Sequence, residues 1–400
     1  MDLLWNIFDC NPSVKLKKWE FYPLIDIDSI QIWYKYPVPK EDIEYTWQSS
    51  VKFQNGDTIM ARITPCLENG KIWQVRTSSD WCIWSTELFV FRGKEWKSIN
   101  EYVYYFMKQN RVRNYAANSM TGASWRQRAD LNFIKKLKFN FPNIIVQWKL
   151  SNILSKYDEL IENNNRRIKI LEEMAEEIYK EWFVRFRFSW QGNCGFELGY
   201  PTSFKKIKVK DITSLKSWFA FKSERFIDEW EAVAKIKDVD WEFMDTSDFS
   251  YVSEENCKKA IKFILKEWDL TVALTWATIW KIWIVPYYSW TIYTNQRLWK
   301  FFNGENPVEK LPYLFELFSS DYMKTMIVNI STSSAAQPNI SPEQIENFDI
   351  ITNKDLIEKY NKLMEPIFRE ILLLKHKILK LVEKRDLLLP RLISWKLEVK

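Results

Sequence analysis

A chain of 400 residues is longer than a single hydrophobic core usually supports, so two or more domains are expected. Its apolar fraction of 46% is sufficient for packed cores. The 58 Lys and Arg residues against 52 Asp and Glu residues leave a formal charge of +6, which permits a polyanionic partner without requiring one.

The cysteines and the N-terminus indicate the compartment. The cysteines are odd in number, widely spaced and without a C-x-x-C pair, which argues against a disulfide framework and a structural zinc site; they are Cys10, Cys66, Cys82, Cys194 and Cys257. The first ten residues have no basic and apolar signal pattern, and no run approaches the roughly 18 apolar residues of a membrane span. A soluble protein of the reducing cytoplasm is therefore expected.

Two segments of the chain have the pattern of mixed α and β structure. The first covers residues 1–145, with strand-like runs at 58–63 and 88–92 and a helical stretch at 101–108. The second covers residues 190–352, with strand-like runs at 270–275 and 281–285. The interleaving of short strands and helices predicts an α+β globule in each segment.

Each globule is followed by a long helix with a coiled-coil stripe, one in residues 146–189 and one in residues 353–400. Mostly apolar residues, with Asn164 as a lone polar member, step alternately by four and three, which is the spacing of core positions in a coiled coil. Each stripe is too narrow for a fully buried helix, so the two helices are expected to pack against each other. The first stripe is Leu150, Leu154, Tyr157, Ile161, Asn164, Ile168, Leu171, Ala175, Ile178 and Trp182, and the second is Ile357, Tyr360, Met364, Ile367, Ile371, Leu374, Ile378 and Leu381.

The two halves of the chain repeat each other. Residues 56–61 (GDTIMA) are echoed by 268–273 (WDLTVA), and residues 70–75 (GKIWQV) by 280–285 (WKIWIV). Fixed self-similarity of this kind predicts a tandem of two similar structural units.

Glycine is scarce and tryptophan is abundant, with 8 Gly against 22 Trp, whereas Gly normally makes up about 7% of a chain. The repeat places Gly56 opposite Trp268 and Gly70 opposite Trp280. We therefore hypothesise that many tryptophans stand where glycine belongs, because UGA codons that the source organism reads as glycine have been translated as tryptophan.

Six strings along the chain are informative together: residues 56–57 (GD) with 62–71 (RITPCLENGK), 121–128 (TGASWRQR), 171–175 (LEEMA) with 182–184 (WFV), 294–297 (TNQR), 336–341 (AQPNIS) and 385–394 (RDLLLPRLIS). In these strings and in their order, the chain resembles the specificity subunits of type I restriction-modification systems along nearly its whole length.

This resemblance implies a fold and a set of partners. It implies target-recognition domain 1 in residues 1–145, a spacer helix in 146–189, target-recognition domain 2 in 190–352, and a second spacer helix and tail in 353–400. The helices would pair antiparallel as a ruler between two domains that each read one half of a bipartite site in double-stranded DNA. Two methyltransferase subunits and two motor-nuclease restriction subunits would join the complex and carry the S-adenosylmethionine, ATP and Mg sites, leaving this chain non-catalytic and free of cofactors.

The sequence also departs from the family pattern. The start looks short by several residues. Tryptophan stands at six places where the family usually has glycine, namely Trp125, Trp276, Trp280, Trp283, Trp299 and Trp395. Trp182 matches a family tryptophan and is expected to be authentic. Glycine replacements should be more exposed, or more strained in φ, than Trp182.

Polar residues in the loops of each half are the candidates for DNA contact. Arginine can pair with guanine O6 and N7, and Asn or Gln with adenine N6 and N7, although a phosphate contact or a structural hydrogen bond is at least as common for any one residue. The candidates are Arg62, Lys71, Arg126, Gln127, Arg128, Lys281, Asn295, Gln296, Arg297, Gln337 and Asn339. Two lysine clusters, either solvated faces or phosphate contacts, are Lys135, Lys136 and Lys138, and Lys205, Lys206, Lys208 and Lys210.

Two other classes of function compete with DNA recognition. A stand-alone adenine methyltransferase should show nucleotide-binding and catalytic motifs, but the chain has no phosphate loop, and its single histidine, His376, lies in the second long helix. A protein-interaction scaffold with two β-rich modules on a coiled coil would bind no DNA, and salt-dependent binding to duplex DNA separates it from the DNA-reading hypothesis.

Overall fold

The computed structural model describes most of the chain and divides it into two compact units. The described residues are 1–25, 34–46, 50–77, 79, 81–84, 87–122, 126–188, 195–216, 221, 226–227, 229–235, 249–258, 260–273, 282–285, 291–295, 298–332 and 340–394. Unit 1 comprises Met1–Asn164 and Ile378–Lys400, and unit 2 comprises Asn165–Lys377. No helix in the described part of the chain combines the length and apolar character needed to cross a membrane.

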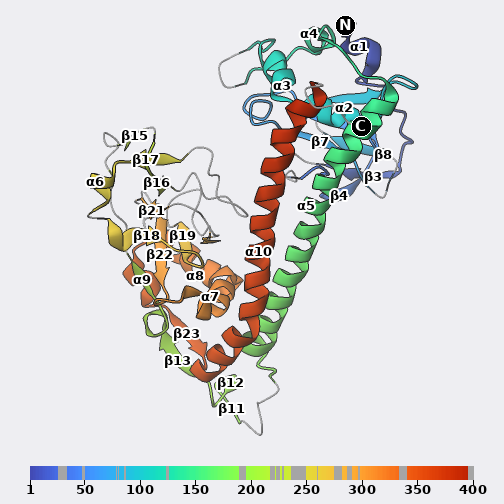
Figure 1. Cartoon of the computed structure of the whole chain (residues 1–400). Helices are drawn as coiled ribbons and strands as arrows, with labels where there is room; N and C mark the ends of the chain where they lie inside the picture. The colour runs from blue at the N-terminus through green and yellow to red at the C-terminus, as the bar shows by residue number, and fades with distance from the viewer. Residues whose placement is uncertain are drawn as a thin grey trace. The chain divides into compact units, whose positions relative to one another are not determined.

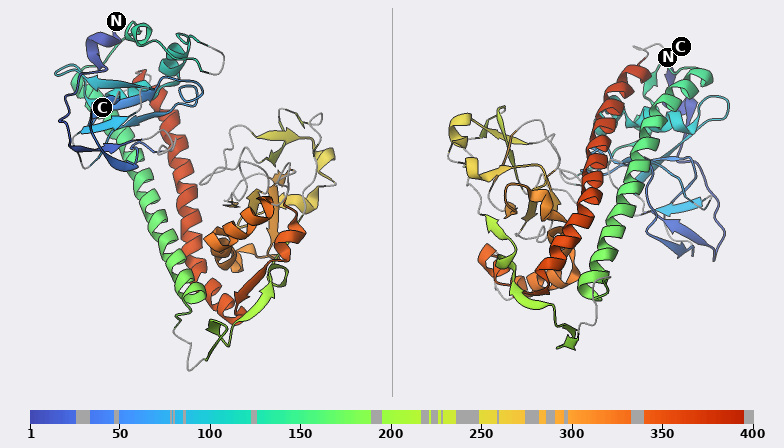
Figure 2. Two further views of the ribbon diagram at one scale, coloured as in Figure 1. Left: turned by 180° about the vertical axis from the view of Figure 1, so that it is seen from behind. Right: turned by 60° about the horizontal axis from the view of Figure 1, so that its bottom comes forward.

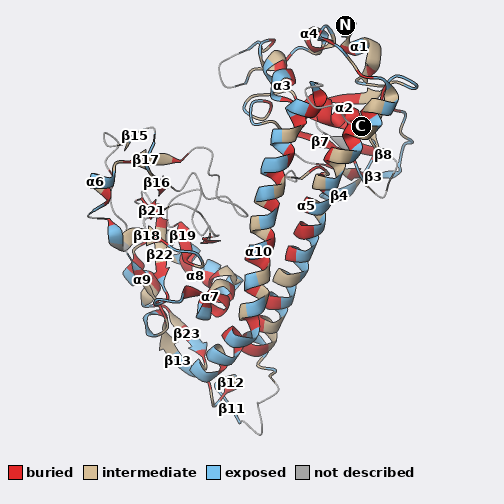
Figure 3. Cartoon of the chain, viewed as in Figure 1, coloured by how far each residue is buried: buried red, intermediate tan, exposed pale blue. Residues whose placement is uncertain are grey.

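Unit 1 contains two four-stranded sheets, with strand orders β2-β9-β6-β7 and β4-β3-β8-β5, and a short antiparallel pair of β1 with β10. Figure 1 labels β3, β4, β7 and β8 of these sheets. Helix α2 packs on the first sheet, and its interior residues from Tyr102 to Met107 are all buried (Figure 3). The elements are β1 (Asp2–Leu3), α1 (Leu4–Ile7), β2 (Phe8–Cys10), β3 (Phe21–Leu24), β4 (Glu41–Glu44), β5 (Val51–Gln54), β6 (Thr58–Ala61), β7 (Ile72–Gln74), β8 (Trp81–Trp84), β9 (Leu88–Gly93), α2 (Asn100–Lys108), α3 (Asn110–Ala117), α4 (Leu131–Lys135) and β10 (Lys138–Phe139).

Unit 2 contains a four-stranded sheet with order β14-β22-β19-β20, a five-stranded sheet with order β15-β17-β16-β21-β18, and an antiparallel pair of β13 with β23. Its elements are β11 (Phe196–Glu197), β12 (Tyr200–Pro201), β13 (Lys205–Lys208), β14 (Ser214–Lys216), β15 (Phe226–Ile227), β16 (Glu231–Ala234), β17 (Ser250–Val252), α6 (Glu254–Cys257), β18 (Ile264–Leu265), β19 (Leu270–Ala273), β20 (Ile282–Ile284), β21 (Ile292–Thr294), β22 (Leu298–Phe302), α7 (Leu311–Ser319), α8 (Asp321–Thr332), α9 (Pro342–Glu346) and β23 (Asp349–Thr352). The expected α+β character is confirmed in both units.

The predicted repeat is present in the folded chain. The sheet β2-β9-β6-β7 of unit 1 has the same order as β14-β22-β19-β20 of unit 2, and each is followed along the chain by three helices and a short strand. The turn before β6 and the turn before β19 share their hydrogen bonds. Gln54 N donates to Asp57 Oδ2 at 2.9 Å, and Lys266 N donates to Asp269 Oδ2 at 2.6 Å.

The two predicted long helices are α5 (Ile144–Tyr179), which continues through a π-helical turn to Val184, and α10 (Lys354–Ile393). None of the residues in either predicted stripe is exposed. Pro366 lies inside α10, which continues through it. In each unit the local segments of the two helices lie side by side (Figure 2), and in unit 2 the pairs Glu172–Lys375 and Ala175–Tyr360 show that they run antiparallel.

Tryptophan occupies backbone positions that suit glycine. Seven described residues other than glycine have a positive φ, and four of them are Trp19 (64°), Trp96 (61°), Trp230 (121°) and Trp268 (73°). Trp268 takes the place of Gly56, whose φ is 87°, in the repeated turn. A left-handed conformation costs a residue with a Cβ atom roughly 1–2 kcal/mol, so these positions support the glycine hypothesis, and three of them were missed in the sequence.

The same hypothesis is wrong in its expectation for Trp283. This residue lies in β20, is 4% exposed against 8% for Trp182, and does not have a positive φ. Its counterpart in the repeat is Trp73, which is 1% exposed in β7. Both indoles fill the same place in a sheet core, so Trp283 belongs there. Trp299 lies in β22 and is half-buried, while Trp125, Trp276, Trp280 and Trp395 lie outside the described residues.

Trp96 offers a direct test, because it is 86% exposed and its indole contributes little packing. Trp96→Gly should have a free energy of unfolding about 1 kcal/mol higher than Trp96→Ala, since only glycine relieves the positive φ. Trp148 is the matched control, being 59% exposed on helix α5. There the order should reverse, because glycine costs about 1 kcal/mol relative to alanine in a helix. Equal stability of the two Trp96 variants in urea unfolding would contradict the strain argument.

Candidate nucleic-acid interface

The predicted readout residues of unit 1 lie on two parts of the chain that the fold joins, residues 62–71 and the described residues 126–129. Thr64 N donates to Gln127 O at 3.0 Å, and Gln127 N donates to Thr64 Oγ1 at 3.1 Å. Arg128 and Thr121 exchange two backbone hydrogen bonds of 3.0 and 3.2 Å. The two segments are therefore adjacent in the fold, which the sequence did not predict.

Glycine is favoured at the end of the first segment. Gly70 has a φ of 70°, and a Cβ atom there would lie 2.1 Å from Nη1 of Arg113 in α3. Arg113 also reaches back to Glu68 O at 3.5 Å and to Asn110 Oδ1. The guanidinium of Arg113, from α3, therefore lies against the predicted readout loop, and Lys71 in this loop is half-buried.

Glu87 lies between two of the predicted arginines. Arg128 donates to it from Nε at 3.1 and 3.0 Å and from Nη2 at 2.6 Å, while Arg62 Nε lies 3.7 Å from its Oε2. Hydrogen bonding from Arg128 lowers the pKa of Glu87, and the charge of Arg62 acts in the same direction. The three side chains are 41%, 35% and 27% exposed for Arg128, Arg62 and Glu87 respectively. Glu87 is therefore an ionised, solvent-accessible partner of two candidate readout cations.

The remaining predicted residues are distributed differently. Arg126 is exposed and Gln127 is half-buried. Asn295 in unit 2 is buried, donates its backbone N to Ala234 O at 3.0 Å, and its Oδ1 has no hydrogen-bond partner among the described residues. The other predicted positions of unit 2 lie outside the described residues; they are Lys281, Gln296, Arg297, Gln337 and Asn339. The base contacts predicted for all of these residues stay predictions.

A basic groove lies elsewhere on unit 1, between α3, the end of α4 and β10, with a volume of about 660 Å³. Its lining includes the cations Arg111, Lys136 and Lys138 and no acidic residue. None of the three forms an ion pair with another described residue, although the guanidinium carbon of Arg111 lies 5.5 Å from the centre of the Phe139 ring. Unneutralised cations in a groove are suited to bind phosphate groups.

The second lysine cluster is partly neutralised in the folded chain. Lys206 and Lys208 lie 3.0 and 3.4 Å from the carboxylate of Asp349, and Lys210 donates to Asn347 Oδ1 at 3.3 Å. This cluster of β13 is consequently a weaker candidate for phosphate binding than the groove of unit 1.

In unit 1 a buried polar cluster joins the helix pair to α2. Arg385 of α10 donates from Nη1 to Asp158 of α5 at 2.6 Å, and the two side chains are 2% and 3% exposed. Tyr105 of α2 donates its hydroxyl to the other oxygen of Asp158 at 2.5 Å. Lys35 Nζ lies 3.4 Å from the Tyr105 hydroxyl. One buried carboxylate thus fixes the position of three elements.

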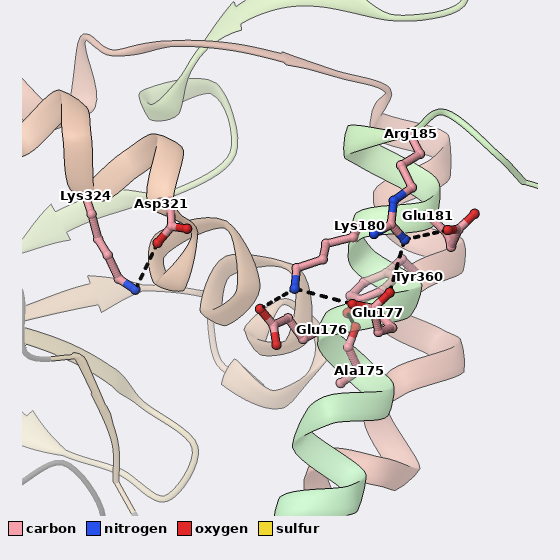
Figure 4. Close-up of polar contacts among 9 residues, drawn as sticks. All are labelled: Ala175, Glu176, Glu177, Lys180, Glu181, Arg185, Asp321, Lys324 and Tyr360. Carbon is pink, nitrogen blue, oxygen red and sulfur yellow. Dashed lines mark hydrogen bonds and ion pairs between the residues drawn. The ribbon is translucent and has the colours of Figure 1, made fainter. Parts of the chain in front are cut away.

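Near the end of α5 in unit 2, a hydrogen bond joins α5 to α10, and ion pairs form between neighbouring turns of α5 and its π-helical continuation (Figure 4). Tyr360 of α10 donates its hydroxyl to Ala175 O at 2.9 Å. Lys180 lies 2.7 Å from Glu176, and Arg185 lies 2.6 Å from Glu181. Glu173, Glu176 and Glu177 are exposed, whereas Glu172 pairs with Lys375 of α10 at 3.0 Å, so this acidic surface of α5 is only partly open to a partner.

Sequence reasoning missed the carboxylates that position the basic residues. Glu87 and Asp158 belong to no recognised string, and nothing in their local pattern distinguishes them from surface acids. Arg385 lay in one of the six strings but had no role assigned to it. A basic residue among the buried apolar positions of α10 was the available signal, because an isolated buried charge requires a partner.

Comparison with known proteins identifies relatives of both the sequence and the fold. Residues 19–173 match the family model of the type I restriction modification DNA specificity domain. The MjaIX specificity subunit of Methanocaldococcus jannaschii is 23% identical over 318 residues, covering 75% of this chain and 70% of that protein. The MjaVIII specificity subunit of the same organism is 24% identical over 227 residues, covering 56% and 52%.

A solved structure has the same fold over the whole chain. The S subunit of a type I restriction-modification system from M. genitalium superposes with a TM-score of 0.54 at 15% sequence identity, covering 100% of this chain and 96% of that one. The predicted architecture of two mixed α and β domains with two long coiled-coil helices agrees with this likeness.

Removing one partner of the buried pair should be costly. Asp158→Asn should lower the free energy of unfolding by about 3 kcal/mol, because Arg385 keeps its charge in a buried place without a carboxylate. The double variant D158L/R385M should recover most of this loss, since buried ion pairs are often replaceable by apolar residues. The exposed pair Glu365–Arg369 of α10 is the control, and Glu365→Gln should cost less than about 1 kcal/mol. Urea unfolding measures all three, and a D158N transition at the unchanged midpoint would refute the role assigned to Asp158.

Proposed function

The chain belongs to the specificity subunits of type I restriction-modification systems, and on this premise we propose that it reads a bipartite site in duplex DNA and positions methyltransferase subunits there. The observation that carries the proposal is the repeat of the fold. Two copies of one sheet-and-helix module, each with its own candidate readout segment, suit a target with two separate parts.

Specificity subunits of this class are non-catalytic, so the chemistry belongs to the partners. We assign the S-adenosylmethionine site to the methyltransferase subunits and the ATP and Mg sites to the motor-nuclease restriction subunits. The isolated chain should be catalytically silent, and the complex should act on DNA in the cytoplasm.

The exposed faces of α5 and α10 are the proposed docking surface for the methyltransferases. Because the chain is a repeat, it offers two quasi-equivalent places for the same partner. Two methyltransferase and two restriction subunits per specificity subunit are therefore expected.

Reconstitution with a methyltransferase subunit of a type I system from the same source tests the proposal. The complex should bind duplex DNA with an affinity that falls steeply with salt, and sequencing of methylated adenines should show a motif in two parts separated by a fixed unread spacer. Native mass spectrometry should detect two methyltransferases per chain. A continuous motif, or a complex that binds no duplex DNA, would exclude the proposed function and favour a protein-interaction scaffold.

The spacer should depend on helix length. Inserting four residues into α5 beside Arg167 and four into α10 beside Glu370, which pair at 2.7 Å, adds about 6 Å at roughly 1.5 Å per residue. The unread spacer should lengthen by about two base pairs, given a DNA turn of about 34 Å for 10 base pairs. An unchanged spacer in the methylated motif of this variant would disprove the ruler.

The groove of unit 1 should contribute to affinity without contributing to sequence choice. Lys136→Glu with Lys138→Glu should weaken binding of all duplexes to a similar degree and lower the slope of log K against log salt by about 1 to 2, because each lost phosphate contact removes roughly 0.9. Lys15→Glu with Lys17→Glu is the control of equal charge on exposed lysines. If both double variants change the slope equally, the groove is not a phosphate site.

A further inference from the structure

We propose that Glu87 is a positioning residue that sets sequence discrimination in unit 1, by orienting the guanidinium of Arg128 and offsetting one of the two positive charges beside it. The inference rests on the proposed DNA-reading function. Glu87 is not among the residues predicted to contact DNA. Its negative charge would lie on a surface that approaches the negatively charged DNA.

The geometry leaves one edge of Arg128 available. Its Nε and Nη2 donate to Glu87, whereas Nη1 makes no hydrogen bond to any described residue, and the side chain is 41% exposed. A guanidinium reads guanine through two parallel donors. Glu87 therefore holds one edge of the fork and leaves donors on the outer edge free for a base.

The backbone around the site is fixed at the same time. Arg62 N donates to Glu87 O at 3.1 Å, Ala129 N donates to Arg62 O at 2.9 Å, and Arg128 is bridged to Thr121. The backbone carbonyl of Glu87 is hydrogen-bonded to Arg62 and its carboxylate to Arg128. The Arg128 side chain is therefore already restricted, and it loses little conformational entropy when it contacts a base. Preorganisation of this kind strengthens a specific contact by lowering its entropic cost.

Charge supplies the second part of the argument. Two guanidinium groups alone would attract phosphates of any sequence, because phosphate attraction carries no sequence information. An ionised carboxylate beside them reduces this attraction at every site on DNA, while a correctly placed guanine still gains its two hydrogen bonds. Specificity is a difference between affinities, so weakening the non-specific state improves discrimination.

A second ion pair of unit 1 provides the comparison. Asp57 and Arg92 are 2.6 Å apart, but the Asp57 side chain is 0% exposed and also accepts Gln54 N within a turn. Unit 2 repeats this arrangement with Asp269 and Lys300. The buried pair stabilises a turn in both units, whereas Glu87 lies at the surface between two candidate DNA contacts. Asp57 thus has a structural role, whereas Glu87 is placed to position a side chain that contacts DNA.

The experiment measures the reconstituted complex with wild-type chain or Glu87→Gln on the methylated target and on a duplex altered in the half-site that unit 1 reads. The dissociation constant is determined for both duplexes over a range of salt concentrations. In E87Q the altered duplex should bind several-fold more tightly, its salt slope should steepen by about 1, and the ratio of the two constants should fall about tenfold. Glu41→Gln, on an exposed residue of β4, removes the same charge and should leave the ratio unchanged.

Two further variants separate positioning from stability. Asp57→Asn should lower the thermal unfolding temperature, as expected of a structural pair. It should weaken binding to both duplexes by the same factor, so that the ratio of the two dissociation constants is unchanged. Arg128→Lys keeps the charge but loses the planar fork, so adding E87Q to it should produce little further loss of discrimination. If E87Q behaves like D57N, or lowers the ratio as much in the R128K background as in the wild type, the positioning role is wrong.

Failure of the underlying function is distinguishable from failure of this inference. A wild-type complex without salt-dependent duplex binding removes the basis for any role of Glu87 in DNA reading. A wild-type complex that discriminates normally, together with an E87Q complex of the same ratio, overturns the role of Glu87 alone.

Discussion

The pairing of α5 with α10 is the constraint on which the rest of the structure depends. Each helix carries an apolar stripe that is too narrow for complete burial, and each stripe is covered by the other helix and by the globule beside it. Apolar packing alone leaves the register of two such helices weakly defined. Polar contacts define it here, through Asp158 with Arg385 in unit 1 and Ala175 with Tyr360 in unit 2. Because Tyr105 of α2 shares Asp158, the same contact that sets the register also fixes the first globule on the helices.

The architecture could be predicted from the sequence because its main features leave regular or repeated patterns along the chain. The stripes, the strand-like runs at 58–63 and 270–275, and the repeat of the two halves all correspond to observed elements. The chemistry of the site was only partly accessible. Arg62 and Arg128 were recognisable as candidates by residue type, but the carboxylate that joins them lies 25 residues from one and 41 from the other. Pairings of this separation leave no periodic trace in one sequence.

The tryptophans show where composition is informative and where it misleads. The shortage of glycine correctly raised the question, and the repeat correctly matched Trp268 to Gly56. The comparison with glycines of the family wrongly placed Trp283 among the glycine replacements. The repeat within the chain matches Trp283 to Trp73, which is buried. Backbone conformation is the better criterion, because a positive φ is a property of the position and does not depend on which residue occupies it. By that criterion Trp19, Trp96 and Trp230 belong with Trp268.

Burial separates the ion pairs of this protein by role. Asp158–Arg385 and Asp57–Arg92 join elements through carboxylates that are almost or completely inaccessible to solvent, and a ligand cannot compete for either without unfolding its surroundings. Glu87 holds two arginines through a carboxylate that remains 27% exposed, so a second ligand can approach the same guanidinium groups. Under the proposed function, such a partner favours sequence discrimination, because cations without one bind phosphates of any sequence. The same acidic residue type therefore serves rigidity when it is buried and selectivity when it is accessible.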